Sequence, residues 1–442
     1  MARGTRCRGR EGGKAVKRMA LAALALAASL LCGCASSMSG GVEELLRAPQ
    51  LAGPQTNVQR ALTAYLGEAP QLKYPQNGEI LSPFLFGDWN GDGSMDAAAL
   101  YVSSGMQNVC LAILEQSGGS WVVTQEIEGL SAEVDSVSTA AMSGDGGMQL
   151  LVGYAGASGE KYLSVYAYQD HTLTQVMEQA YSQYELQDIT GSGLKDLILI
   201  GPQTSDGMKV QLLTAIRGEF AMAQEFWLSP ERFSSCEGLH LSSGADGGYY
   251  LVLDGYVGSG AALASILLGY NATTQQLEEY TPLLPVDVYT ESIRYSSLLT
   301  STDIDGDGTV EIPVELPDAN GHITVGRLSF VAWMDYTSTT PEKSFGIVDL
   351  ENGFYLELPP SWEGKIQVKE GSQEGSWAIR SLEDGTGYLE VRVVEPSTEG
   401  GSYFRLGNVG GKKVQARILA SHIGENGENL QPAALTDCFR VL

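Results

Sequence analysis

Short runs of apolar residues, separated by turns rich in glycine and aspartate, recur along most of the chain. In the first unit this pattern predicts four strands, at 80–86, 97–102, 109–114 and 121–127. Later units divide in the same way, with strands expected at 162–168 and 209–215. Short strands bounded by turn residues are typical of all-β folds. The pattern therefore predicts an all-β protein.

A loop rich in aspartate and glycine precedes five of the apolar runs. The clear copies are Asp88–Asp96 and Asp303–Glu311, Asp188–Asp196 is weaker, and two eroded copies contain Gly144-Asp145-Gly146 and Ala245-Asp246-Gly247. Aligned on the residue before the second glycine, the copies stand at positions 92, 145, 192, 246 and 307. A period near 50 residues, with a turn before each strand, indicates the blades of a β-propeller. The alternative is a β-sandwich with ordinary glycine-aspartate turns.

These loops resemble the FG-GAP or VCBS-type repeats of integrin-like propellers, and the chain resembles a clostridial type of bacterial surface lipoprotein that carries them. The resemblance is good in the two clear copies, fair at 188–196 and poor in the second and fourth units. It implies a β-propeller, or a propeller-like repeat array, of about five blades over residues 79–345.

Two segments flank the expected repeats. The apolar spacing of residues 56–66 predicts a helix that ends at Gly67, within a tether and helix segment at 34–78. After the repeats, residues 346–442 change character. New strands at 377–381, 388–394 and 414–419 predict a small C-terminal β-rich domain.

Calcium is the ion that the two clear loops predict. Calcium takes oxygen ligands, and side chains at positions 1, 3, 5 and 9 of a loop can surround it together with the carbonyl at position 7. In the first loop the ligands would be Asp88, Asn90, Asp92, the carbonyl of Ser94 and Asp96. In the last they would be Asp303, Asp305, Asp307, the carbonyl of Thr309 and Glu311. The alternative is a turn held by hydrogen bonds from aspartate side chains to the backbone, without metal.

The loops depart from a complete calcium motif in two ways. Position 12, a bidentate glutamate in an EF-hand, holds Ala99 or Val314. The FG-GAP resemblance implies a calcium loop that stops at position 9 and runs into a strand. The third loop carries fewer charges and leaves metal binding open, while the second and fourth loops, which begin at Ala141 and Ser242, are expected to bind nothing.

The first 33 residues have the pattern of a lipoprotein signal peptide. Seven basic residues precede Met19, and a 13-residue apolar run follows that is too short to span a bilayer. The segment Leu31-Cys32-Gly33-Cys34 resembles a lipobox, with cysteine in place of the more usual alanine or serine before the glycine. The resemblance implies a diacylglycerol on Cys34 that anchors the chain to the extracellular face of the cell membrane. An ordinary cleaved signal and an uncleaved anchor are the alternatives.

Net charge and cysteine content limit the partners and the cysteine sites that the chain can have. The formal net charge of the chain is −26, and removal of residues 1–33 changes it to −32. A surface this acidic excludes nucleic acid as a partner, because binding to a polyanion requires basic groups. The three later cysteines, Cys110, Cys236 and Cys438, are few and widely spaced, so we expect small buried hydrophobes, although one pair can still form a disulfide.

No familiar catalytic motif is present. The four histidines are far apart in sequence, and no HExxH, Gly-x-Ser-x-Gly or P-loop pattern occurs. We therefore expect a non-enzymatic binding or structural scaffold that presents a propeller face to an extracellular protein or glycan. Five tyrosines are candidates to line that face: Tyr154, Tyr166, Tyr168, Tyr250 and Tyr256. The alternative for each of them is that it fills an ordinary strand position. A carbohydrate-active hydrolase or lyase on the same scaffold and a purely structural envelope protein are the alternatives.

Overall fold

The structure is a computed structural model of the 442-residue chain and describes residues 53–282, 284–317, 327–420 and 430–442. The chain divides into two compact units, 1–56 and 57–442. The signal segment 1–33 and the lipid site Cys34 lie outside the described residues. No helix in the described ranges is long and apolar enough to cross a membrane.

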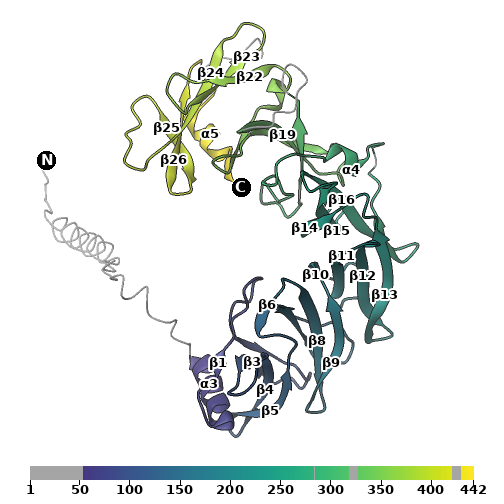
Figure 1. The fold of residues 1–442 in the computed structure, drawn as a ribbon. Coiled ribbons are helices and arrows are strands. Elements are labelled where there is room, and N and C mark those ends of the chain that lie inside the picture. The colour runs from purple at the N-terminus through teal and green to yellow at the C-terminus, as the bar shows by residue number, and fades with distance from the viewer. Residues whose placement is uncertain (1–52, 283, 318–326, 421–429) are drawn as a thin grey trace, which may run out of the picture. The chain divides into compact units, whose positions relative to one another are not determined.

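Within the described residues, the strands of the second unit form six antiparallel sheets (Figure 1). The first contains β1 (Gln71–Leu72), β2 (Phe84–Gly87), β3 (Asp96–Val102), β4 (Cys110–Ser117) and β5 (Ser120–Glu128). The second contains β6 (Glu133–Ala140), β7 (Gln149–Ala155), β8 (Lys161–Gln169) and β9 (Thr172–Ala180). The third contains β10 (Gln183–Gln187), β11 (Asp196–Thr204), β12 (Gly207–Ile216) and β13 (Glu219–Leu228).

The remaining sheets continue the series. The fourth contains β14 (Ser235–Ser243), β15 (Tyr249–Val257), β16 (Ala262–Asn271) and β17 (Gln276–Glu279). The fifth contains β18 (Ile312–Leu316), β19 (Leu328–Met334), β20 (Glu342–Asp349), β21 (Phe354–Leu358) and β27 (Phe439–Val441). The sixth contains β22 (Ile366–Glu370), β23 (Trp377–Ser381), β24 (Gly387–Val394), β26 (Lys412–Ile418) and β25 (Phe404–Val409).

The few helical segments are short, apart from α3 (Gly53–Leu66). The others are α4 (Val288–Glu291), the 3-10 helix η1 (Pro360–Trp362) and α5 (Pro432–Asp437). The helix predicted at 56–66 is the greater part of α3, and its residues Val58 and Leu62 are fully buried. The expected all-β array of repeated sheets, followed by a β-rich C-terminal region, is confirmed.

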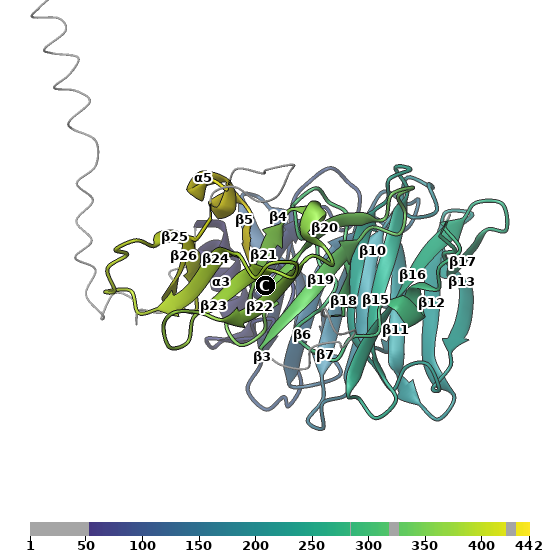
Figure 2. The same cartoon turned by 90° about the horizontal axis from the view of Figure 1, so that it is seen from above.

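The core lies between successive sheets, and one strand shows how. Leu150 and Val152 of β7 pack in a cluster with the first sheet, whereas Leu151 between them packs in a cluster with the third. Because side chains alternate along a strand, a sheet covered on both faces needs apolar residues at consecutive positions. This explains the unbroken apolar runs of the sequence. Figure 2 shows β11 and β15, which share the cluster between the third and fourth sheets, side by side.

The fifth and sixth sheets correct the expected domain boundary. The boundary placed between residues 345 and 346 falls inside β20, whose partner β21 extends the same sheet to Leu358. The C-terminal strand β27 then pairs with β21, so the chain end returns to the fifth sheet. One apolar cluster joins both sheets. The sequence change at 346 marks new turns within a continuous β structure.

The proposed tyrosine face is wrong for four of its five residues. Tyr154, Tyr166, Tyr168 and Tyr250 are at most 8 % exposed, and the first three belong to the core between the first and second sheets. The hydroxyls of Tyr154 and Tyr166 bond each other at 3.0 Å, which satisfies both inside the core. All three described cysteines are free thiols.

Candidate functional site: the aspartate-glycine loops and a polar cavity

Each of the five aspartate-glycine loops leads into a buried strand, namely β3, β7, β11, β15 or β18. All five share one backbone feature. The glycine at the sixth position has a φ between +81° and +90° in each copy: Gly93, Gly146, Gly193, Gly247 and Gly308. Residues with a side chain are strained in this conformation. The copies aligned by sequence therefore share this left-handed turn, including the two eroded ones, whereas a left-handed glycine at the fourth position is found in the first, third and fifth copies, at Gly91, Gly191 and Gly306.

The side chain at the ninth position closes four of the loops. It accepts the backbone N–H of the second position at 2.7–3.2 Å: Asp96 from Trp89, Gln149 from Met142, Asp196 from Ile189 and Glu311 from Ile304. Each acceptor side chain is at most 3 % exposed. Gln149 makes this bond without a charge, so the bond has a structural role that requires no metal.

Neighbouring loops are also joined to each other. The eighth residue of one loop donates its N–H to the first residue of the preceding loop: Met148 to the carbonyl of Asp88, Lys195 to the carbonyl of Ala141, and Val310 to the hydroxyl of Ser242. These bonds link the first loop to the second, the second to the third, and the fourth to the fifth. This role explains why the second and fourth loops persist although they lack the predicted ligands.

The first loop is closed by its own aspartates. The carboxylate of Asp88 accepts three backbone N–H groups at 2.7–3.1 Å, those of Gly91, Asp92 and Gly93. Asp92 accepts the N–H of Ser94 at 2.7 Å, and this bond lowers the pKa of Asp92. Burial raises the pKa of Asp96 to about 6. Within the described part of the chain, no ion pair reaches Asp88, Asp92 or Asp96.

The fifth loop repeats this geometry with more negative charge. Asp303 accepts the N–H groups of Gly306, Asp307 and Gly308 at 2.7–3.0 Å. One oxygen from each of Asp303, Asp305 and Glu311 lies within 4.8 Å of the other two. Three carboxylates this close need a positive charge among them, because like charges in a confined site repel. The oxygen-only set suits calcium in kind.

A lysine from a later strand supplies that positive charge. The ammonium group of Lys343 lies 2.5 Å from Asp307, 2.8 Å from Glu311 and 3.5 Å from Asp305. Burial disfavours the charged lysine, but the bonds to Asp307 and Glu311 outweigh it and raise the pKa of Lys343. The hydrogen bond from Lys343 in turn lowers the pKa of Asp307. The fifth loop therefore has a cation of its own.

A β-bulge brings Lys343 to the loop. Between β19 and β20, Trp333 pairs with Ser344 and Met334 with Glu342, so Lys343 is the extra residue. A bulge re-aims the side chain of the inserted residue. The corresponding bulge in the first sheet, between β4 and β5, inserts Thr124. The two clear loops thus differ in the residue that the neighbouring bulge supplies.

The third loop is closed almost entirely by hydroxyl and backbone groups. Asp188 accepts the N–H groups of Ser192 and Gly193 at 2.9 and 2.7 Å. Asp196 accepts from the backbone N–H of Thr190 at 2.9 Å and also from the hydroxyl of Thr214. Thr190 and Ser192 stand where the clear loops have asparagine or aspartate, so this loop has two carboxylates. Both accept hydrogen bonds from groups of the protein itself.

A second feature, absent from the sequence predictions, is a polar cavity of about 770 Å³. Strands β6 and β10 line it, together with the segment 77–80 and Leu241 of β14. The backbone of Asn77 donates to the carbonyl of Asp135 at 2.7 Å, which holds this segment against β6. The cavity size lies within the range of small-molecule sites.

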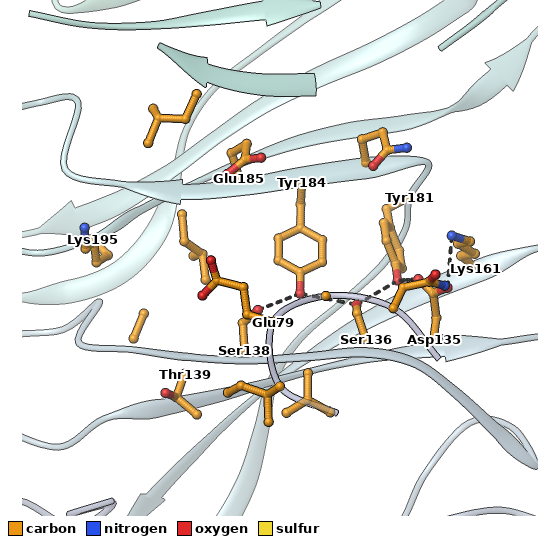
Figure 3. Close-up of a pocket in the computed structure, with 18 of the residues that line it drawn as sticks. Glu79, Asp135, Ser136, Ser138, Thr139, Lys161, Tyr181, Tyr184, Glu185 and Lys195 are labelled. Carbon is orange, nitrogen blue, oxygen red and sulfur yellow. Dashed lines mark hydrogen bonds and ion pairs between the residues drawn. The ribbon is translucent and has the colours of Figure 1, made fainter. Parts of the chain in front are cut away.

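A chain of hydrogen bonds lines one wall of the cavity (Figure 3). Tyr184 contacts Ser138 at 2.9 Å and Ser136 at 3.3 Å, and Ser136 contacts Tyr181 at 3.4 Å. Tyr181 donates to Asp135 at 2.5 Å, and Lys161 forms an ion pair with Asp135 at 3.0 Å. Burial by itself would raise the pKa of Asp135, but the bonds from Tyr181 and Lys161 outweigh it and lower this pKa.

The lining carries two further carboxyl groups. Glu79 is exposed, whereas Glu185 of β10 is half-buried. Burial raises the pKa of Glu185 to about 7, and the nearby charge of Glu79 contributes in the same direction. Figure 3 shows Glu79 beside the Tyr184 ring, whereas Glu185 lies on the other side of β10 from that ring.

Some of these residues can be recognised from the sequence alone. The loop ligands follow from spacing, but the ninth-position role of Gln149 was missed because the first position of its loop, Ala141, has no ligand. The cavity unites Asp135 with Tyr181, 46 positions later. No local motif marks such a pair. Polar residues occupy four of the five positions 135–139, inside the largely buried strand β6, and this is the available clue.

No protein-family model and no curated protein matches the sequence. Several solved structures are similar at low levels. A rhamnogalacturonan lyase from Bacillus licheniformis is 10 % identical with a TM-score of 0.30, over 72 % of this chain and 75 % of that one. A putative 6-phosphogluconolactonase from Bacteroides fragilis is 12 % identical with a TM-score of 0.30, over 59 % and 79 %. A protein from Lactobacillus plantarum is 12 % identical with a TM-score of 0.28, over 69 % and 93 %. Likeness at this level establishes neither a shared fold nor a shared activity.

Proposed function

We propose that the chain is a lipid-anchored extracellular binding scaffold whose loops take up calcium and whose partner is a protein or a glycan. The observation that carries the binding role is the polar cavity between β6 and β10. Its lining holds hydroxyl, carboxyl and ammonium groups on two neighbouring sheets, and a rigid frame with convergent polar groups is the usual form of a ligand site.

The anchor rests on the lipobox-like segment that ends at Cys34. Two acyl chains hold a protein at a membrane much more firmly than one, since each buried methylene contributes about 0.8 kcal/mol. The Cys34→Ala variant should move from the membrane fraction to the soluble fraction, with Cys110→Ala as the matched control. An unchanged distribution of Cys34→Ala would contradict the anchor.

The calcium proposal differs between the two clear loops. In the first loop the ion would complete a set of oxygen ligands that has no cation of its own among the described residues. In the fifth loop it would have to displace Lys343 from Asp307 and Glu311. Calcium binding should therefore be tighter at the first loop. Isothermal titration of the full chain in detergent, with and without the Asp88→Asn substitution, measures this.

A hydrolase or lyase acting on carbohydrate is the second candidate function. It is favoured by the presence of Glu79 and Glu185 in one cavity, with the pKa of Glu185 raised to about 7. A carboxyl group that stays protonated near neutral pH beside a second carboxyl group is an arrangement used in acid-base catalysis of glycoside cleavage. Release of reducing ends or unsaturated products from polysaccharides, lost in Glu185→Gln and retained in Glu178→Gln, would establish it.

A further inference from the structure

We propose that the cavity between β6 and β10 binds a neutral saccharide, with Ser138 and Tyr184 as the residues that contact its hydroxyl groups. This inference rests on the proposed binding function and names the class of ligand. It is carried by the direction of the hydrogen-bond chain on the cavity wall, by the aromatic ring within it, and by the balance of charges around it.

The direction of the chain follows from its fixed end. Asp135 is paired with Lys161, so its carboxylate only accepts, and Tyr181 must donate to it. Each hydroxyl has a single proton to donate. All the bonds can therefore form together only if Ser136 donates to Tyr181, Tyr184 to Ser136, and Ser138 to Tyr184.

The last hydroxyl of this chain is left with acceptor capacity. Ser138 uses its proton on Tyr184, at 2.9 Å, and keeps its oxygen lone pairs for a donor in the cavity. Both Ser138 and Tyr184 are half-buried, whereas Tyr181 and Ser136 are buried. The hydroxyl of Ser138 is therefore oriented at the open end of the hydrogen-bond chain. The other end of the chain is fixed at the ion pair of Asp135 and Lys161.

The chain is also held rigid by its surroundings. The rings of Tyr181 and Tyr184 meet edge to face with centroids 5.6 Å apart. Gly153 of β7 lies directly under the chain, because a Cβ atom there would come within 2.2 Å of the Tyr181 hydroxyl and 2.6 Å of the Ser136 hydroxyl. A site whose polar groups are already positioned loses less entropy when it binds.

The charges of the lining favour a neutral, hydroxyl-rich ligand. Three acidic and two basic side chains line the cavity: Glu79, Asp135, Glu185, Lys161 and Lys195. Asp135 and Lys161 neutralise each other at 3.0 Å, and Glu185, with a pKa of about 7, is partly protonated at neutral pH. A protonated Glu185 donates a hydrogen bond, and Glu79 accepts one when it is ionised. Alternating donors and acceptors beside an aromatic ring match the hydroxyl groups and apolar face of a sugar ring.

The test uses the full chain in detergent with three neutral trisaccharides as probes: maltotriose, cellotriose and mannotriose. Saturation-transfer NMR should show binding of at least one of them. Ser138→Ala should raise its Kd about tenfold, the size expected for one lost hydrogen bond. Tyr184→Phe, which removes the hydroxyl and keeps the ring, should raise the Kd by a similar factor. Tyr162→Phe, at an exposed tyrosine of β8 outside the cavity, should leave the Kd unchanged.

Two results would overturn the saccharide site. One is the absence of binding by all three probes. The other is a Kd that Ser138→Ala and Tyr184→Phe leave unchanged, which would place the sugar elsewhere on the protein. Melting curves show that each variant is folded before its Kd is compared. Because anchoring and calcium uptake are measured separately, on Cys34 and Asp88 variants, failure of the saccharide site and failure of the proposed scaffold remain distinguishable.

Discussion

The first and fifth aspartate-glycine loops share most of their backbone hydrogen bonds, but of the two the fifth alone holds a lysine among its carboxylates. In both, the first aspartate, Asp88 or Asp303, accepts three backbone N–H groups. In both, the ninth residue accepts one more from the second position. The fifth loop, however, holds the ammonium group of Lys343 among its carboxylates. Among the described residues the first loop has no such partner.

This difference shows that one backbone motif can form with or without a lysine beside its carboxylates. The loop shape depends on left-handed glycines and on aspartate-to-backbone bonds, neither of which needs an ion. The three carboxylates that meet in the fifth loop do need a positive charge. In the fifth sheet the β-bulge supplies it as Lys343, whereas the bulge of the first sheet inserts Thr124. Under the proposed function, calcium would act at the first loop, and Lys343 takes the place of the ion at the fifth.

The largest expected effect is that of calcium on stability. At a free calcium concentration one hundred times Kd, the free energy of unfolding should rise by about 2.7 kcal/mol relative to chelator. The Asp88→Asn substitution should remove most of this gain, since it removes a charged ligand and changes the shape least. Thermal unfolding of both proteins in calcium and in EDTA measures the effect.

The matched control for that prediction is Asp303→Asn, the same substitution at the same loop position. It should leave most of the calcium gain in place, because Lys343 already occupies the carboxylates of the fifth loop. A loss of the gain in Asp303→Asn with retention in Asp88→Asn would reverse the assignment of the two loops.

The next effect concerns the lysine itself. Lys343→Thr gives the fifth sheet the residue type that the first sheet has at its bulge. In chelator it should lower the free energy of unfolding by about 2 kcal/mol, because Glu311 stays buried without its partner. Calcium should restore this loss, so the variant should gain a second calcium-dependent step in titration calorimetry.

Lys209→Thr controls for the removal of a lysine as such. Lys209 pairs with Glu225 at 3.4 Å, and both side chains are about one-third or more exposed. A surface pair of this kind contributes about 0–1 kcal/mol, and its removal should create no calcium dependence. If Lys343→Thr behaved like Lys209→Thr, Lys343 would not be the cation of the fifth loop.

The loops could be predicted from the sequence because their pattern is local. Positions 1 to 9 lie on one short segment, and the apolar run that follows places the segment before a buried strand. The sheets could be predicted for the same reason, since most strands within a sheet pair with the next strand along the chain. The expected boundary at 345/346 was wrong because β21 and β27 join the fifth sheet by pairing that composition does not reveal.

The cation of the fifth loop and the cavity could not be predicted in this way. Lys343 is 32 positions from Glu311, and it reaches the loop only because β20 carries a bulge at that residue. Tyr181 reaches Asp135 only because the second and third sheets pack face to face. Both depend on strand register. The pattern of apolar residues predicts which face of a sheet a residue lies on, but it does not predict where a bulge inserts an extra residue.

Replacing a left-handed glycine by alanine should destabilise the protein less than the changes above, and by the same amount in either loop. Gly93→Ala and Gly308→Ala place a side chain at φ +82° and +90°. Gly93 has open space for a Cβ atom, and at Gly308 the nearest atom, the hydroxyl oxygen of Ser243, would lie at an ordinary 3.7 Å. The cost is therefore conformational, about 1 kcal/mol in each case. Chemical unfolding in chelator should give the same loss for both, and unequal losses would show that the two backbones are not equivalent.

The smallest expected effect is that of salt on stability. Salt should destabilise the fifth loop and stabilise the first. Salt weakens attraction between partly exposed opposite charges, and it also weakens repulsion between like charges. In chelator, raising the salt concentration should therefore weaken the Lys343 contacts of the fifth loop and relieve the repulsion among Asp88, Asp92 and Asp96 in the first. The wild-type protein should have a larger free energy of unfolding than Lys343→Thr at low salt. At high salt this difference should be smaller by about 0.5 kcal/mol. The free energy of unfolding of Asp88→Asn should rise less with salt than that of the wild-type protein, because the variant carries one negative charge fewer.

The contradicting outcome is a difference in the free energy of unfolding between wild type and Lys343→Thr that stays the same at high salt. Lys343 would then act through packing of its side chain. The carboxylates of the fifth loop, like those of the first, would lack a cation.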